Sequence, residues 1–197
     1  MSQPKPVSAS QTTITELMIP SYANFGGKIH GGILLSLMDK VAYACASKHA
    51  GSYVVTVAVD EVDFLQPIEV GELVSLHASV HYVGRSSMVV GIYVIAENVQ
   101  TGQQKRTNTS YFTMVAKDEN NKPKEVPALL LENKEQVRFF LEALQRRQLK
   151  TTFTNEFANQ KTHLVIEENL HLLEKERCKF SDTLLKTDDS RLKRESM

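Results

Sequence analysis

The sequence predicts an α+β fold, in which a long antiparallel sheet wraps around one central helix and a helical extension follows at the C-terminal end. Two observations favour this arrangement. The segment Ile33–His49 is apolar almost all round, which is typical of a helix buried on most sides. The four segments after it have strand patterns and are joined by short turns, so successive strands should pair antiparallel around that helix.

Composition limits the classes of protein to consider. The 197 residues suffice for one domain with a core and a tail. Lys plus Arg and Asp plus Glu both number 23, which argues against general nucleic-acid binding because that needs a basic surface. No segment approaches the ~20 apolar residues of a membrane span. The N-terminal residues lack a signal-peptide pattern, and Cys45 and Cys178 form no disulfide framework, so we expect a cytoplasmic protein.

The segments before and after the central helix follow in order. Residues 1–11 are expected to be flexible, Thr12–Met18 is a candidate strand, and Pro20–Gly32 is a glycine-containing loop. The predicted strands after the helix are Tyr53–Leu65, Leu73–Val83, Ser87–Glu97 and Gln103–Lys117. Apolar and polar residues alternate most clearly in the second of these, as a strand with one buried face requires.

Domain boundaries follow from composition. Residues 12–127 form the predicted compact domain, and the last proline, Pro127, closes it. Residues 128–150 are predicted to hold an amphipathic helix, because apolar residues recur at near-helical spacing within Asn133–Lys150. Residues 151–197 are expected to be a charged tail, helical or partly disordered, with a further helix at Thr162–Lys179.

Several standard catalytic motifs are missing. The sequence contains no G-x-S-x-G nucleophile elbow, no Walker A loop, no H-E-x-x-H and no G-x-G-x-x-G that opens a helix after a strand. His77 and His81 share one side of a predicted strand, which we interpret as a half-exposed polar face rather than a metal site. We therefore predict no metal site.

Asp39 is the unusual residue of the central helix. Asp is seldom buried without a partner, and the polar positions of this helix form only one narrow stripe, so we expect Asp39 to have little access to water. Asp39 also lies two turns after Gly31 and Gly32 at the helix start, where backbone N–H groups are free and a ligand can approach closely. Such donors near a carboxylate can polarise a carbonyl and direct water at it. The alternative is a solvated Asp without a role.

The turn at Val83–Met88 is a second candidate for binding. Arg85 lies between Gly84 and the hydroxyl groups of Ser86 and Ser87, and these groups together can hold a phosphate. The alternative is an ordinary hairpin turn with a solvated arginine.

Asn24–Asp39 resembles the signature N-x-x-G-x-[IL]-[FHY]-G-G-x-[LI]-[LM]-x-x-[LM]-D of hot-dog-fold acyl-CoA thioesterases, in the branch that contains YciA and the brain-type cytosolic acyl-CoA hydrolases. The segment Val54–Asp60, with Phe64 and Pro67 after it, is similar to the next block of that family, and Val83–Met88 to the block after that. The resemblance implies the hot-dog fold and covers about residues 12–127.

The resemblance also implies a role for each matching residue. Asp39 corresponds to the catalytic carboxylate, Gly31 and Gly32 to the site whose backbone N–H receives the thioester carbonyl, and Asn24 to an amide that places the thioester or its water from the facing subunit. The expected contacts with substrate or coenzyme A are His30, Gly31, Thr56, Val57, Gly84, Arg85, Ser86 and Ser87. His30 departs from the Phe or Tyr that is common in this family.

The function implied by the resemblance is hydrolysis of acyl-CoA to a carboxylic acid and coenzyme A. Asp39 would act as a general base or as a nucleophile that forms an anhydride, and the sequence leaves both open. No separate cofactor is expected, because coenzyme A is part of the substrate. Because one site needs two domains, the chain should form a homodimer, and the family relation implies a homohexamer. The alternatives are a hot-dog dehydratase or hydratase and a non-catalytic acyl-CoA-binding protein. The sequence does not predict the preferred acyl chain length.

Overall fold

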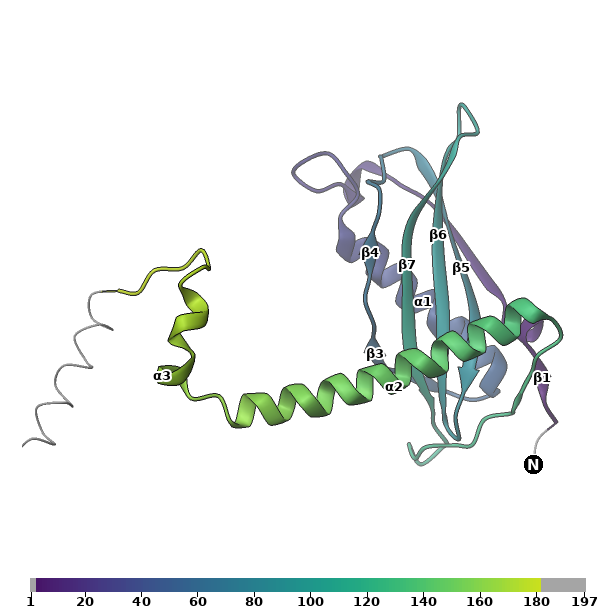
Figure 1. The fold of residues 1–197 in the computed structure, drawn as a ribbon. Helices are drawn as coiled ribbons and strands as arrows, with labels where there is room; N and C mark the ends of the chain where they lie inside the picture. Colours follow the sequence, from purple (N-terminus) through teal and green to yellow (C-terminus); the bar gives the residue numbers. More distant parts are fainter. Residues whose placement is uncertain (1–2, 182–197) are drawn as a thin grey trace, which may run out of the picture. The chain divides into compact units, whose positions relative to one another are not determined.

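The structure is a computed structural model that describes residues 3–181 (Figure 1). It divides into two compact units, and the boundary between them falls after Gln148. The elements of the first unit are β1 (Lys5–Pro6), η1 (Val7–Ala9), β2 (Thr12–Leu17), η2 (Pro20–Tyr22), α1 (Gly31–Ala50), β3 (Val54–Val59), β4 (Asp63–Phe64), β5 (Glu72–Val83), β6 (Ser87–Asn98), β7 (Gln104–Ala116), β8 (Leu129–Leu130) and the first part of α2 (Lys134–Thr162). The second unit contains the rest of α2, α3 (Ile166–Asn169) and η3 (Leu170–Leu173).

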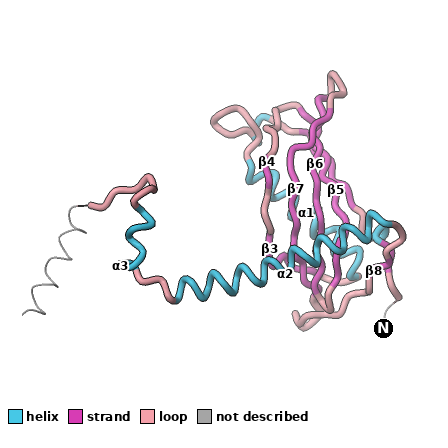
Figure 2. The backbone as a smooth tube through the Cα atoms, in the orientation of Figure 1, coloured by secondary structure: helices cyan, strands magenta, loops and turns pink. Residues whose placement is uncertain are grey.

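The main sheet is antiparallel and has the strand order β2-β5-β6-β7-β3, with the short β4 also paired to β7. Figure 2 shows its long strands side by side. Buried and half-buried residues alternate along the whole of β5, as the sequence pattern predicts. Helix α1 lies along one face of this sheet (Figure 1), and the predicted sheet around a central helix is confirmed.

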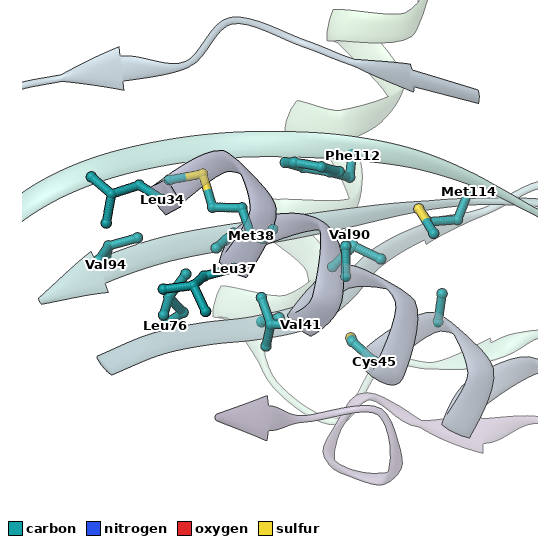
Figure 3. Close-up of a cluster of buried hydrophobic side chains, with 14 of the residues drawn as sticks. Leu34, Leu37, Met38, Val41, Cys45, Leu76, Val90, Val94, Phe112 and Met114 are labelled. Atoms are coloured by element: carbon teal, nitrogen blue, oxygen red, sulfur yellow. The ribbon is translucent and has the colours of Figure 1, made fainter. Parts of the chain in front are cut away.

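The core lies between α1 and the sheet (Figure 3). Helix α1 contributes side chains that are at most 6% exposed, namely Leu34, Leu37, Met38, Val41, Ala42, Cys45 and Ala46. Fully buried residues of the strands meet them, among them Leu76, Val90, Phe112 and Met114. Burial of each large side chain contributes about 1.5–3 kcal/mol. This packing fixes the rotation of α1, and therefore fixes which side chains of the helix face away from the sheet.

The first part of α2 covers the opposite face of the sheet near the turn between β5 and β6. A β-bulge between Val80 and Tyr82 brings Tyr82 into a second cluster with Ala143, which is 1% exposed. Arg147 Nη1 donates a hydrogen bond of 2.6 Å to the Tyr82 hydroxyl. The His81 ring stacks on Phe139 with centroids 4.5 Å apart, and burial lowers the pKa of His81 to about 4.

The N-terminal segment differs from the flexible peptide expected for residues 1–11. Lys5 N–H donates to the Ala128 carbonyl, and β1 pairs with β8 in parallel. The Lys5 ammonium donates to the carbonyl of His49 at 2.7 Å and to that of Lys48 at 3.2 Å. These carbonyls belong to the last turn of α1 and have no intrahelical donor, which explains why a lysine from outside the helix is held there. Val7 is buried as well.

Three predicted boundaries were wrong. The expected strand Tyr53–Leu65 is divided into β3 and β4, because the pairing of β3 with β7 shifts between Thr56 and Ala58. Helix α2 continues to Thr162 instead of ending at Lys150, since neither Gly nor Pro interrupts this segment. The helix expected at Thr162–Lys179 is reduced to the short α3 and η3. The part of the predicted tail at 182–197 lies outside the described residues.

Candidate active site

Asp39 lies in the middle of α1 and faces away from the core. Its carboxylate oxygen Oδ1 accepts a hydrogen bond from Thr56 Oγ1 at 2.6 Å, so β3 orients the side chain. The expectation of a shielded carboxylate is wrong for the single chain, in which Asp39 is exposed. The sheet covers only one side of α1, and the polar stripe of the helix with Asp39 lies on the other.

The start of α1 is built from His30, Gly31 and Gly32. His30 is the N-cap residue, and its Nδ1 atom accepts a hydrogen bond from the Gly32 N–H at 2.9 Å. The Gly32 N–H that the sequence predicted to be free is therefore already paired. The Gly31 N–H forms no hydrogen bond with another described residue.

Phe64 is a residue of this region that the residue-by-residue prediction missed. A Cβ atom at Gly31 would lie 3.2 Å from two ring atoms of Phe64, so an aromatic ring from β4 covers the first helical glycine. A side chain at position 31 would press against this ring. The signal was present in the sequence, because Phe64 belongs to the second block of the family resemblance.

Asn24 shapes the loop before α1. Its side-chain oxygen accepts hydrogen bonds from the N–H groups of Gly26 at 2.9 Å and Lys28 at 3.2 Å. Its backbone N–H and carbonyl also pair within the loop, with Lys28 and Gly27. Among the described residues no hydrogen bond links the side chains of Asn24 and Asp39, the two predicted catalytic residues.

The turn between β5 and β6 holds the predicted phosphate-binding residues. Gly84 N–H donates to the Ser87 carbonyl at 2.8 Å, and the Arg85 carbonyl accepts from Val126 N–H at 2.9 Å. Arg85 and Ser86 line a cavity of about 300 Å³ together with Pro123 and Glu125. Arg85 is exposed and forms no ion pair with any described residue, so its guanidinium is available to an anion. The carboxylate of Glu125, which lines the same cavity, would repel an anion there.

The remaining predicted contacts lie on β3. Thr56 is the partner of Asp39, and Val57 next to it is 61% exposed at the irregularity of the strand. The structure therefore brings Thr56 and Asp39 together. The turn with Arg85 forms a separate site on the same unit. Within residues 3–181, no group of three or more His, Cys, Asp or Glu side chains is arranged to hold a metal ion. None of the described helices is long and apolar enough to cross a membrane.

A curled antiparallel sheet around one long helix, with a carboxylate on that helix, is the arrangement of the hot-dog thioesterases. Residues 26–103 match the family model described as "Thioesterase superfamily". Protein VdlD of Helicobacter pylori is 43% identical over 135 residues, which cover 68% of this chain and 77% of VdlD. The uncharacterized acyl-CoA thioester hydrolase YkhA of Bacillus subtilis is 36% identical over 154 residues, covering 78% of this chain and 86% of YkhA.

A solved structure agrees with these relatives. The crystal structure of an apo-hexameric acyl-CoA thioesterase is similar with a TM-score of 0.75 and 38% identity, and the match covers 78% of this chain and 98% of that one. The chain belongs to the thioesterase superfamily. The predicted family and the hot-dog fold are thereby confirmed.

Proposed function

We propose that the chain hydrolyses acyl-CoA thioesters to a carboxylic acid and coenzyme A. The observation that carries this proposal is the carboxylate of Asp39, oriented by Thr56 on the central helix of a thioesterase fold. Water adds its oxygen to the thioester carbon, the C–S bond breaks, and the thiolate of coenzyme A leaves with one proton. Relatives named acyl-CoA thioester hydrolases support this reaction.

Asp39 supplies the base or the nucleophile in this proposal. Thr56 engages Oδ1 and leaves Oδ2 to act. Asp39 comes seven positions after Gly32, which corresponds to about 10 Å of helix rise. A thioester carbonyl at the helix start and a water molecule fit between them, which favours general-base catalysis by a carboxylate of the same chain. Direct attack needs reacting atoms about 3–3.5 Å apart, so an attacking carboxylate would come from a second copy.

Coenzyme A would be held by the turn at Gly84, Arg85, Ser86 and Ser87. The guanidinium fork of Arg85 suits a phosphate group, and the hydroxyl groups beside it add neutral donors. Thr56 and Val57 would line the path of the pantetheine and acyl groups. No further cofactor is needed, because the thioester itself is the activated group.

A second copy would complete the site. No hydrogen bond joins Asn24 to Asp39 among the described residues, and β3 is an edge strand whose Val57 and Val59 are 61% and 45% exposed. An exposed apolar edge strand favours pairing with another strand, and the pairing of two β3 strands would join two sheets into one. We therefore propose a homodimer in which Asn24 serves the site of its partner. The hexameric relative supports assembly of such dimers into a homohexamer, which we place in the cytoplasm.

The dehydratase alternative would need an accessible histidine near the helix. His49 is fully buried at the far end of α1 and its Nε2 atom pairs with the Pro127 carbonyl at 2.9 Å. Burial lowers the pKa of this histidine. His49 therefore has a structural position. The other histidine at α1, His30, caps the start of the helix, and the relatives named acyl-CoA thioester hydrolases favour hydrolysis over dehydration.

Release of free thiol from acyl-CoA, followed with a thiol reagent, tests the proposed function. Wild-type protein should release thiol from at least one member of a series of acyl chain lengths. Asp39→Asn should reduce kcat at least about a hundredfold, because it removes the charge that both routes need. Asp63→Asn is the matched control, since the structure uses the Asp63 backbone carbonyl and Asp63 lies on the exposed β4. Binding of acyl-CoA without turnover by the wild type would instead indicate a binding protein.

A further inference from the structure

His30 is an unusual N-cap for α1. Ser, Thr, Asn and Asp are the residues that usually accept a hydrogen bond at this position. Here the ring nitrogen Nδ1 accepts from Gly32 N–H at 2.9 Å, and the ring lies against Gly32. A Cβ atom at Gly32 would lie 3.0 Å from Nδ1 and 3.1 Å from Cε1, so the glycine leaves the space that the ring occupies.

The hydrogen bond from Gly32 determines which ring nitrogen carries the proton. An acceptor at Nδ1 has no proton, so the neutral ring carries its proton on Nε2. His30 is exposed, and its Nε2–H forms no hydrogen bond with another described residue. The side chain therefore presents one oriented donor to the space in front of the helix start.

The same hydrogen bond removes Gly32 N–H from the donors that a thioester carbonyl can use. A carbonyl could reach this N–H only after His30 had left its position as N-cap. The Nε2–H group lies across the ring from Nδ1, and the hydrogen bond from Gly32 N–H to Nδ1 couples the ring to the positive end of the α1 dipole. A neutral imidazole at a helix N-terminus polarises a substrate carbonyl in an unrelated enzyme.

We propose that His30 Nε2–H, and not Gly32 N–H, donates to the thioester carbonyl oxygen in the transition state of hydrolysis. This role rests on the proposed thioesterase function. In this role Nε2 keeps its proton while the oxygen gains negative charge. Gly32 is then the residue that fixes the tautomer and orientation of His30, and the open Gly31 N–H is a second donor at the same helix end.

Two substitutions separate this role from simple capping. His30→Asn keeps an acceptor for Gly32 N–H but has no donor at the position of Nε2. His30→Gln places an amide N–H close to that position. Removal of a donor to a developing oxyanion lowers kcat roughly a hundredfold or more. We expect His30→Asn to show this loss with KM changed less than threefold and the melting temperature kept. His30→Gln should retain more of kcat than His30→Asn.

A purely structural cap predicts the opposite order. His30→Asn would then keep the kcat of the wild type, and this result would overturn the proposal. His30→Phe removes both ring nitrogens, so it should lower kcat and also the melting temperature. A rise in kcat of this variant would mean that the His30 ring blocks Gly32 N–H, and this result would also overturn the proposal. ¹⁵N chemical shifts of the His30 ring give an independent reading. A protonated Nδ1 in the neutral ring would contradict the inferred tautomer.

These outcomes distinguish the two proposals. If the wild type releases no thiol from any acyl-CoA, the proposed function fails and the role of His30 fails with it. If the wild type is active, Asp39→Asn is inactive and His30→Asn is fully active, only the role of His30 fails.

Discussion

Thr56 Oγ1 donates a hydrogen bond of 2.6 Å to Asp39 Oδ1, and this contact joins the edge strand β3 to the central helix at the proposed catalytic carboxylate. The Thr56 hydroxyl oxygen also lies 3.4 Å from the Met114 sulfur on β7. This contact on the core side holds the rotamer of Thr56. One carboxylate oxygen is therefore fixed and the other is left to act on water or substrate.

Thr56 should accordingly be a positioning residue for Asp39. A hydrogen bond to a charged group contributes about 1.5–3 kcal/mol, and exposure of this pair favours the lower value. Thr56→Val keeps the β-branched shape of the side chain and removes the donor, so we expect kcat to fall about tenfold. Thr56→Ser keeps the hydroxyl and should retain most of kcat. Equal kcat values for the Val and Ser variants, with both proteins folded by circular dichroism, would count against this role.

The charges around the β5–β6 turn lead to a prediction about substrate affinity. Arg85 is exposed and unpaired among the described residues, and Glu125 lines the same cavity. Arg85→Ala should raise KM for acyl-CoA about ten- to a hundredfold with a smaller change in kcat, because a charge-assisted contact with phosphate is lost. Glu125→Gln should lower KM, because it removes a repulsive charge. The comparison needs steady-state kinetics at low ionic strength, and an unchanged KM in both variants would place the phosphates elsewhere.

Acid should destabilise the fold through buried histidines. Burial lowers the pKa of His81 from 6.5 to about 4, so the unfolded chain binds the proton more tightly than the folded chain. The free energy of unfolding should therefore decrease as pH falls from about 6.5 to about 4, by roughly 3 kcal/mol from this residue. Urea titrations at pH 7 and pH 4.5 measure the loss. His81→Gln cannot titrate and should show a smaller difference between the two pH values; an equal difference would exclude His81 as the cause.

The boundary after Gln148 predicts how the chain tolerates truncation. Residues 134–148 cover Tyr82 and Val89, whereas residues 149–181 show exposed apolar side chains such as Leu149 and Phe153. A chain that ends at Gln148 should keep its fold and its thioesterase activity. A chain that ends at Asn133 should lose stability, because it uncovers the second cluster. Thermal unfolding followed by circular dichroism compares the stability of the two truncated chains. Loss of assembly in the chain that ends at Gln148 would assign residues 149–197 to an interface between copies.

The sequence was sufficient for the central helix and for the order of the strands, because both depend on local periodicity. The apolar surface of Ile33–His49 and the alternation in β5 come directly from which residues touch the core. The ends of elements were harder to predict. The break between β3 and β4 depends on pairing with β7, and the anchoring of Lys5 depends on carbonyls 43 and 44 residues away along the chain. No local pattern encodes such contacts.

The candidate site shows the same division. Asp39 was found from its position two turns after Gly31 and Gly32, but its exposure depends on which side of α1 the sheet leaves open. The contact of Thr56 with Asp39 joins residues 17 apart in the sequence, and only the packing of β3 beside the helix creates it. His30 drew attention as a departure from the family pattern. The hydrogen bond that its ring accepts from Gly32 N–H could not be predicted from the sequence, since a histidine is not a usual N-cap.

The last prediction concerns the completion of the site by a second chain. Asn24 and Asp39 share no hydrogen bond within the described residues of one chain, and the proposed dimer pairs Asn24 of one copy with Asp39 of the other. Asn24→Ala and Asp39→Asn should each be inactive alone. In a dimer that combines the two variants, one site carries both substitutions and the other carries neither. Random exchange in an equal mixture makes half of the dimers mixed, so about a quarter of the wild-type activity should return.

Subunit exchange must be proved for this experiment to be decisive. Mass spectrometry of one ¹⁵N-labelled variant mixed with the unlabelled other one reports the fraction of mixed dimers directly. Activity should rise in proportion to that fraction and reach half of the wild-type value per mixed dimer. A mixture of Asp39→Asn with Thr56→Val is the matched control, because these two residues meet within one chain. Each site of such a mixed dimer therefore carries one of the two substitutions. Complete exchange without recovery of activity would mean that Asn24 acts within its own chain, and it would remove the reason for a shared site.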